Sequence, residues 1–430
     1  MKDTRNARQL GRGDGSWAAR LAGSRVHYGW VIAGLGMATV FACLGIARFS
    51  LGMLLPSMRA DMDLSYTDMG FISTGNFVGY LVAALVCGRL VRRFGARAVV
   101  FSSLIIIALS LFVVASAGAV TLIWPAYLVT GLGSGAANVG VMSLVPHWFS
   151  RRWRGRAAGI MVIGSGPAIM MSGLLIPAIT DRWGPAGWRI GWVCLAVVVL
   201  VVALVVGVLI RNAPADLGIR VHTHRVDMTA HGRQSSESAP TGNARTVAHF
   251  GAIYFLFGFT YVVYVTFIVT SLVQERGVSE RNAGYFWFAV GALSMFSGPV
   301  FGALSDRAGR RVGMAAVFAL HTVSYLLVGL HLPIEAVYAS VALFGFAAWS
   351  IPGIIAAAVG DYMGPGQAAT TFGMLTVIFG LGQAIGPLVA GVLAEKSGGF
   401  STSFLMVSAL AACACALSLA LRPPSPAMAS

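Results

Sequence analysis

Long runs of apolar residues constrain this chain more than any other feature. Twelve stretches of roughly 20 residues or more, almost free of charge, are separated by polar turns. That length is what an α-helix needs to cross the hydrocarbon core of a bilayer. Of the 430 residues, 57% are hydrophobic and 10% are charged, a balance that excludes a soluble globular domain. The sequence therefore predicts an all-α membrane protein with 12 transmembrane helices.

The predicted spans fall into two groups of six. We expect an N-terminal six-helix bundle at 28–210, a polar linker at 211–247 and a C-terminal six-helix bundle at 248–421, with tails at 1–27 and 422–430. The expected spans lie near 28–56, 69–90, 98–118, 121–146, 157–180 and 189–210, and then near 248–274, 284–304, 312–330, 335–358, 370–394 and 402–421.

Basic residues collect on one side of this layout. With the N-terminus placed inside, 23 of the 30 Lys and Arg fall in the tails, the linker and the turns on that same side. Cytoplasmic loops of membrane proteins carry such an excess, so both termini are predicted to be cytoplasmic, in a cell (inner) membrane. The net charge of +15 then belongs to loops that flank the lipid bilayer, and this placement argues against nucleic acid as a partner.

Two charged turns indicate that the halves are related. Gly302–Arg311 reads GALSDRAGRR, and Gly88–Arg97 reads GRLVRRFGAR, with Arg92 in place of the aspartate. The segments Gly164–Ile169 and Gly380–Ile385 form a second echo at nearly the same spacing. Repetition at two independent places predicts two similar bundles.

Two six-span halves, each with a charged turn after its second span, resemble the major facilitator superfamily. Gly302–Arg311 matches that family's signature G-x-L-x-D-R-x-G-R-R. His27–Trp30, Gly45–Phe49 and Arg211–Gly218 are similar to the monocarboxylate-porter, oxalate–formate and YbfB-type branches. The resemblance implies the major facilitator fold and transport by rocking of the two halves about a central site. Span 284–304 departs from the monocarboxylate porters because it lacks their acid–arginine pair.

Polar side chains inside apolar spans are the candidate substrate-binding residues. Arg48 lies well inside span 1, where burying a cation costs about 2.5–3.5 kcal/mol, although an arginine that snorkels to the surface is the alternative. The resemblance implies that spans 1, 4, 7 and 10 line the pathway. The other candidates are Asn76, Asn138, Trp349 beside a break at Pro352-Gly353, Gln383, and Tyr261 and Tyr264, which belong to a row of aromatic residues along one face of span 7. Helix packing is the alternative role for the tyrosines.

Charged residues in the inner turns are candidates for a cytoplasmic gate. The predicted gate consists of Arg92, Arg93, Asp306, Arg307, Arg310 and Asp361. By half-to-half symmetry, we expect Asp306 to pair with an arginine of 151–156, and Asp361 to pair with Arg92 or Arg93. Anchoring of the topology at the anionic inner leaflet is the alternative role.

The leading hypothesis is a monomeric secondary transporter, a symporter, of a small organic anion such as a monocarboxylate. Every Asp and Glu can be placed in tails, loops or helix ends, so coupled protons would travel on the substrate or on a peripheral group such as Asp68. No motif supports an enzyme, and no metal or cofactor is expected. An exporter of drug-like or aromatic compounds and a non-transporting membrane sensor are the alternatives.

Overall fold

The computed structural model describes residues 28–217, 244–330 and 332–421, and every regular element in these ranges is a helix. Within the described ranges, 12 helices are long and apolar enough to cross a membrane. The predicted all-α class and the predicted number of spans are therefore confirmed. Most of the linker and both tails lie outside the described residues.

The first six spans are built from the following elements. They are α2 (Tyr28–Val40), the π-helical segment η1 (Phe41–Phe49), α3 (Ser50–Met62), α4 (Tyr66–Phe94), α5 (Ala96–Ser116), α6 (Val120–Met142), α7 (Val145–Trp148), α8 (Arg151–Ile163), α9 (Ser165–Trp183) and α10 (Gly187–Leu209), followed by the 3-10 turn η2 (Pro214–Leu217). The segments α2, η1 and α3 form one continuous span, Tyr28–Met62.

The last six spans follow in the same manner. They are built from α11 (Ala244–Thr270), the π-helical segment η3 (Ser271–Glu275), α12 (Glu280–Ala308), α13 (Arg310–Gly329), α14 (Ile334–Ala347), α15 (Ser350–Ser397) and α16 (Ser401–Ala420). Helix α15 carries parts of two spans, which meet at Gly364, where the backbone has a φ of 71°.

The first span is longer than the sequence pattern suggests. We expected it to end at Pro56, but the helix continues through Pro56 to Met62 and ends at Asp63, whose φ is 51°. Proline removes one backbone hydrogen bond, and tight packing can hold the helix together around it. Residues 50–58 are all buried, so the surrounding helices supply that packing.

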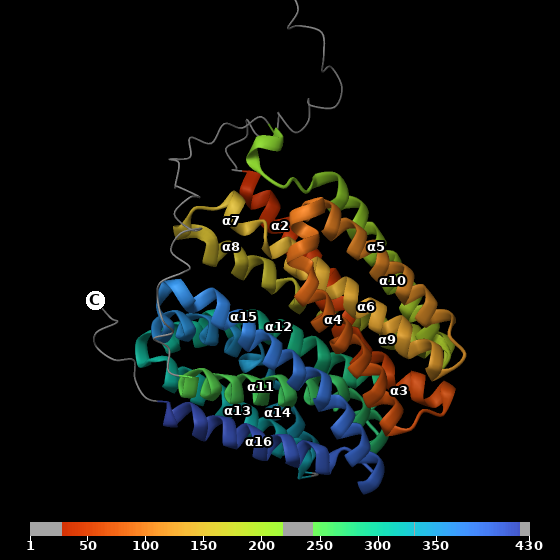
Figure 1. The fold of residues 1–430 in the computed structure, drawn as a ribbon. Helices are drawn as coiled ribbons and strands as arrows, with labels where there is room; N and C mark the ends of the chain where they lie inside the picture. The colour runs from red at the N-terminus through yellow and green to blue at the C-terminus, as the bar shows by residue number, and fades with distance from the viewer. Residues whose placement is uncertain (1–27, 218–243, 331, 422–430) are drawn as a thin grey trace, which may run out of the picture.

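The two groups of helices form two bundles that lie side by side (Figure 1). In the first bundle, α6 packs against both α4 and α5; in the second, α13 packs against α14 and α16. Contacts of α4 with α15, of α9 with α12 and of α3 with α11 join the bundles.

Each bundle repeats the same turn after its second span. Gly95 ends α4 with φ 80° and ψ 153°, and Gly309 ends α12 with φ 91° and ψ 154°. Residues that carry a side chain rarely adopt a positive φ, so this backbone conformation requires the glycine in each charged turn. We call the side of the molecule with these turns and residues 211–217 the linker side, and the side with the turns at 62–66, 183–187 and 275–280 the far side.

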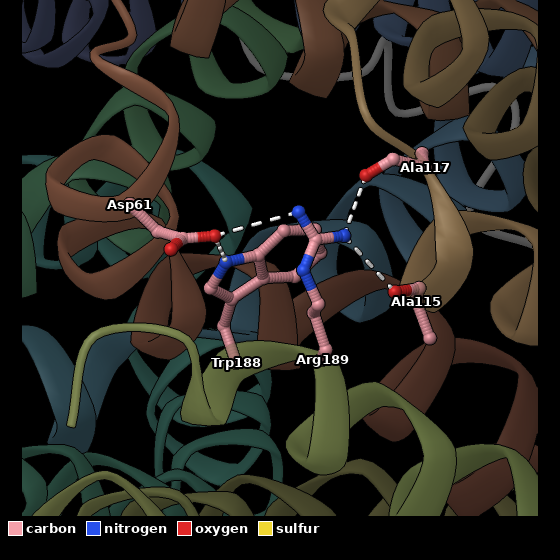
Figure 2. A network of polar contacts seen from close by, with 5 residues as sticks. All are labelled: Asp61, Ala115, Ala117, Trp188 and Arg189. Atoms are coloured by element: carbon pink, nitrogen blue, oxygen red, sulfur yellow. Dashed lines mark hydrogen bonds and ion pairs between the residues drawn. The ribbon is translucent and has the colours of Figure 1, made fainter. Parts of the chain in front are cut away.

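A polar network fixes the far side of the first bundle (Figure 2). Asp61 accepts a hydrogen bond from the indole N–H of Trp188 at 2.9 Å and forms an ion pair with Arg189 at 3.4 Å. Arg189 also donates to the carbonyl oxygens of Ala115 and Ala117 at 3.2 and 2.6 Å. Because these groups come from α3, α5 and α10, the network ties three helices together at one end.

The two bundles are closed against each other on the far side. Glu280 accepts hydrogen bonds from Ser57 at 2.8 Å and from Thr180 at 2.5 Å. Glu395 accepts a bond from the backbone N–H of Tyr66 at 2.7 Å. Every hydrogen bond that we find between described residues of the two bundles lies on the far side or near mid-membrane. This conformation is therefore closed on the far side.

Glycines bring the two backbones into close contact along the same interface. A Cβ atom added to Gly52 would lie 2.4 Å from the carbonyl oxygen of Val265, and one added to Gly173 would lie 2.6 Å from that of Gly284. Added to Gly391, it would lie 2.5 Å from the carbonyl oxygen of Tyr66. No larger residue fits at these three positions without separating the bundles.

Candidate functional site

Arg48 occupies the π-helical segment at the middle of the first span. Single π-helical turns inside α-helices frequently occur at functional sites, because the extra residue per turn changes where side chains point. The residue is 8% exposed, so the alternative role, an arginine that snorkels to the surface, does not describe this structure. A guanidinium at this depth needs partners from neighbouring helices.

Aromatic rings supply part of that environment. The guanidinium carbon of Arg48 lies 4.7 Å from the ring centre of Phe77 and 4.2 Å from that of Tyr80, both on α4. Such cation–π contacts stabilise a desolvated cation by about 2 kcal/mol or more. The hydroxyl of Tyr127 donates to the backbone carbonyl of Arg48 at 3.2 Å, which holds the π-helical turn against α6.

A small cavity lies beside Arg48, where the two bundles meet. Its volume is about 10 Å³, the lower limit for one water molecule. Arg48, Asn76 and Tyr127 line it from the first bundle, and Val265 and Thr266 line it from the second. A group bound here would touch both bundles.

Several polar atoms around this cavity are buried without a hydrogen-bond partner. They include Nε and Nη2 of Arg48 and Oδ1 of Asn76, whose amide nitrogen donates to the carbonyl of Ala47 at 3.4 Å. Buried polar groups are almost always bonded, and an unmade bond costs about 1–3 kcal/mol. The two free guanidinium nitrogens can together bind a carboxylate by donating two parallel hydrogen bonds.

The second bundle contributes an aromatic wall opposite Arg48. The ring of Trp349 lies 4.9 Å from that of Phe49 across the bundle interface, and 5.5 Å from that of Tyr261. Gln383 donates a hydrogen bond to the hydroxyl of Tyr261. The indole nitrogen of Trp349 is buried and unpartnered, so it is a further free donor.

The interruption in span 10 differs from the expected one. We placed it at Pro352-Gly353, but the helix ends at Ala347 and resumes at Ser350. Pro352 lies in the first turn of α15, where its missing N–H is not needed by the helix. The backbone N–H of Trp349 bonds to Ser297 at 3.2 Å instead, and this contact positions the indole at the interface.

The structure brings most of the predicted substrate-binding residues together, and one of them lies elsewhere. Asn138 donates to the hydroxyl of Tyr80 at 2.8 Å and is thereby linked to the ring over Arg48. Tyr264 instead lies inside the second bundle, stacked on Phe344 at 4.2 Å and hydrogen-bonded to Ser340 at 2.9 Å. It is fully buried there, so we do not retain it in the candidate site.

Tyr80, Phe77 and Tyr127 are the neighbours of Arg48 that sequence reasoning missed. A signal for them exists in the spacing: Tyr80 lies one helical turn after Asn76, and Tyr127 lies one turn before Gly131 on the small and polar face of α6. Neither residue stands out alone, because tyrosine is enriched in membrane proteins generally, at the membrane–water interfaces.

The acidic residues of the linker-side turns are paired within the second bundle. Arg310 donates to Asp361 at 2.6 Å, and it also donates to Asp306 and to Ser305. The pairings expected between bundles are absent among the described residues of this conformation. Arg310 lies one helical turn from Asp306 and occupies both carboxylates. Between the described residues on the linker side, we find no hydrogen bond that joins the two bundles. Arg92, Arg93 and Arg307 are exposed.

Asp68, the predicted peripheral proton group, has a local structural role. Its backbone N–H bonds to the Ser65 hydroxyl at 3.0 Å, and its carboxylate accepts from the backbone N–H and hydroxyl of Ser65 at 3.1 and 2.7 Å. This capping box begins α4 and uses the carboxylate for that purpose.

Comparison with known proteins places these features in context. A family model described as "Uncharacterised MFS-type transporter YbfB" matches residues 40–420. The "Probable sulfoacetate transporter SauU" of Cupriavidus necator is 25% identical over 404 residues, covering 88% of this chain and 90% of that protein. "Monocarboxylate transporter 11" of Mus musculus is 28% identical over 400 residues, covering 89% and 84%.

A solved structure supports the same fold. The crystal structure of a bacterial homolog of the human lysosomal transporter Spinster aligns with a TM-score of 0.70 at 16% identity, covering 93% of this chain and 98% of that one. At this identity the likeness concerns the arrangement of the helices.

Proposed function

This chain belongs to the family of MFS-type transporters represented by YbfB, and from that premise we propose that it carries a small organic anion across the inner membrane by alternating access. The observation that carries the proposal is Arg48, a buried cation with two unpartnered nitrogens beside a cavity that both bundles line. Two relatives, named as a probable sulfoacetate transporter and a monocarboxylate transporter, agree with an anionic substrate.

Each residue of the proposed site has a distinct role. Arg48 takes the carboxylate through Nε and Nη2, and the free amide oxygen of Asn76 accepts from a substrate hydroxyl or from a carboxylic acid proton. Trp349 and Tyr261 contact the apolar body of the substrate. Gln383 orients the Tyr261 hydroxyl, and Asn138 orients Tyr80 over the guanidinium.

The cavity of about 10 Å³ is too small for a whole substrate. We therefore propose that it receives only the anionic group, while the rest of the substrate lies toward the linker side. There Trp349 and Tyr80 are only partly covered. This placement favours a compact anion with a small apolar body, such as a monocarboxylate.

We propose that the linker side faces the cytoplasm, since most of the basic residues lie there. The conformation described here is then inward-facing, because its closed side is the far side. On closure of the linker side, Asp306 and Asp361 would exchange Arg310 for arginines of the first bundle, including Arg92 and Arg93. This rearrangement is our proposed cytoplasmic gate, with Arg307 at its edge.

We expect the chain to act as a monomer. Coupled protons would enter on the substrate carboxylate, because the acidic residues of the described segments lie at helix ends or in turns. A symport of proton and anion would then need only the site around Arg48.

Transport of radiolabelled carboxylates into proteoliposomes tests this function. A charge-assisted hydrogen bond stabilises binding by about 1.5–3 kcal/mol, so Arg48→Gln should weaken substrate binding by roughly ten- to a hundredfold. Arg48→Lys supplies charge without the two parallel bonds and should retain weak transport. Arg281→Gln removes an exposed arginine on the far side and should transport like the wild type.

The experiment has a clear contrary result. Full activity of Arg48→Gln toward every carboxylate that the wild type carries would remove the anion assignment. Export of drug-like or aromatic compounds by the same fold would then be the function to test.

A further inference from the structure

An apolar groove runs along the outside of the first bundle on the linker side. It lies between α4 and α5, which each pack against α6 but make few contacts with each other. Its volume is about 600 Å³, and Gly133 and Ala136 of α6 lie at its base. Val86, Leu90 and Ile106 line it and are 41%, 37% and 42% exposed. The small residues at the base make the groove deep enough to hold a chain.

The length of the groove matches one leaflet of a bilayer. Its lining on α4 runs from Val82 to Phe94, and the twelve steps between these residues span roughly 18 Å at 1.5 Å per residue. The hydrocarbon core of a bilayer is about 30 Å thick, so one leaflet provides roughly 15 Å. The groove therefore extends from the membrane surface to about the bilayer midplane.

Arginines lie at the outer end of the groove. Arg93 is three residues after Leu90 and seven after Val86, so it shares their face of α4. Its guanidinium carbon lies 5.2 Å from the ring centre of Phe94, which is itself part of the lining. Arg89 and Arg92 are exposed on the same turn.

No carboxylate neutralises these three arginines within the described part of the chain. In the matching turn of the second bundle, Arg310 binds both Asp306 and Asp361. In the first bundle, Arg92 stands at the position of the aspartate. Asp216, the carboxylate of the described segment 211–217, accepts bonds from the backbone N–H groups of Asn212 and Ala213.

We propose that this groove is a binding site for an anionic phospholipid of the surrounding bilayer. One acyl chain lies in the groove along α4, and the phosphate is bound by Arg93, with Arg89 and Arg92 adding positive charge. The apolar lining would accept the chain of any lipid, and the unneutralised arginines select the anionic headgroup. Because α4 also contacts α15 of the other bundle, the bound lipid would hold a helix of the bundle interface in place.

Native mass spectrometry of the purified full chain tests this site. The protein in detergent is titrated with phosphatidylglycerol, or with phosphatidylcholine of the same acyl chains, and the affinity of the first bound lipid is measured. We expect the wild type to prefer phosphatidylglycerol. Arg93→Gln should weaken binding of phosphatidylglycerol about fivefold and leave that of phosphatidylcholine unchanged, because one basic residue near a membrane surface contributes about that factor. Arg93→Lys should keep the preference.

Two further variants separate the groove from the general surface. Ala98→Phe fills the groove and should weaken the binding of both lipids, whereas Val201→Phe, on the exposed face of α10, should change neither. Arg182→Gln is the matched control for charge, since Arg182 lies over Trp183 at 5.3 Å on the far side, away from the groove. A wild type without headgroup preference, an Arg93→Gln variant that keeps it, or an Ala98→Phe variant that binds both lipids normally would each overturn the proposal.

Discussion

Glu280 is the residue whose substitution should most directly change the balance between the two faces of the transporter. Its carboxylate belongs to the second bundle, and both of its hydrogen-bond donors, Ser57 and Thr180, belong to the first. The two hydroxyl-bearing residues are 1% and 8% exposed. The contact exists only while the far side is closed, so it stabilises that conformation and not the alternative one.

The expected size of the effect follows from these two bonds. A hydrogen bond to a charged group contributes about 1.5–3 kcal/mol, and one between neutral groups contributes about 0.5–1.5 kcal/mol. Glu280→Gln removes the charge and keeps the shape, so the closed far side should lose about 2–3 kcal/mol, a factor of about 30 to 150. Since Glu280 is only partly buried, we expect the lower end, about thirtyfold.

Labelling of a cysteine in the cavity measures this shift. On a background without the five native cysteines, Ser73→Cys places a thiol in the lining of the cavity. A membrane-impermeant reagent added from the far side reaches it only when that side opens, so the labelling rate should rise about thirtyfold in Glu280→Gln. Glu335→Gln removes another carboxylate on the far side, one that is exposed, and should leave the rate unchanged. An unchanged rate in Glu280→Gln would refute the reasoning.

Two further predictions concern the proposed orientation and gate. Cysteines introduced at exposed far-side positions within 57–66 and 276–283, such as Ala60→Cys and Asn282→Cys, should be modified from outside intact cells. Cysteines in 211–247 should be modified only after permeabilisation, and external labelling of the linker would contradict the proposed orientation. Asp306→Asn should weaken closure of the linker side and raise the labelling of a cavity cysteine from that side, whereas Arg307→Gln, at the edge of the proposed gate, should have the smaller effect. Equal labelling of wild type and Asp306→Asn would leave this turn as a topology anchor.

The number and class of the helices could be predicted because they depend on local composition. A run of apolar residues long enough to cross a bilayer has few other stable conformations, whatever its neighbours are. Helix ends depend on packing as well, and there the prediction was less accurate. We predicted that the first span ends at Pro56, but Pro56 lies inside the helix. We predicted a helix break at Pro352, but the break lies just before it, and Pro352 is in the first turn of α15.

The surroundings of Arg48 show where sequence reasoning stops. A cation inside an apolar span is visible in the sequence, but the sequence left open whether its side chain is buried or snorkels to the surface. Its partners Phe77 and Tyr80 come from another helix, and their identity depends on how α4 rotates about its axis. The same dependence explains Tyr264, which is close to Tyr261 in sequence but faces the interior of its own bundle. We had expected Tyr264 to face the bundle interface, and the spacing of residues along a helix does not determine which face of the helix meets that interface.

The glycine contacts between the bundles have a thermodynamic consequence. At Gly52, Gly173 and Gly391 the surfaces that meet on the far side are backbone atoms, which have no rotamers to immobilise. Ordering a long side chain costs up to about 2 kcal/mol of conformational entropy, and glycine adds none of that side-chain cost. At these three positions, closing and reopening the face therefore changes the side-chain entropy little. The entropy of the remaining side chains at the interface, and of the water they release, sets how the cycle responds to temperature.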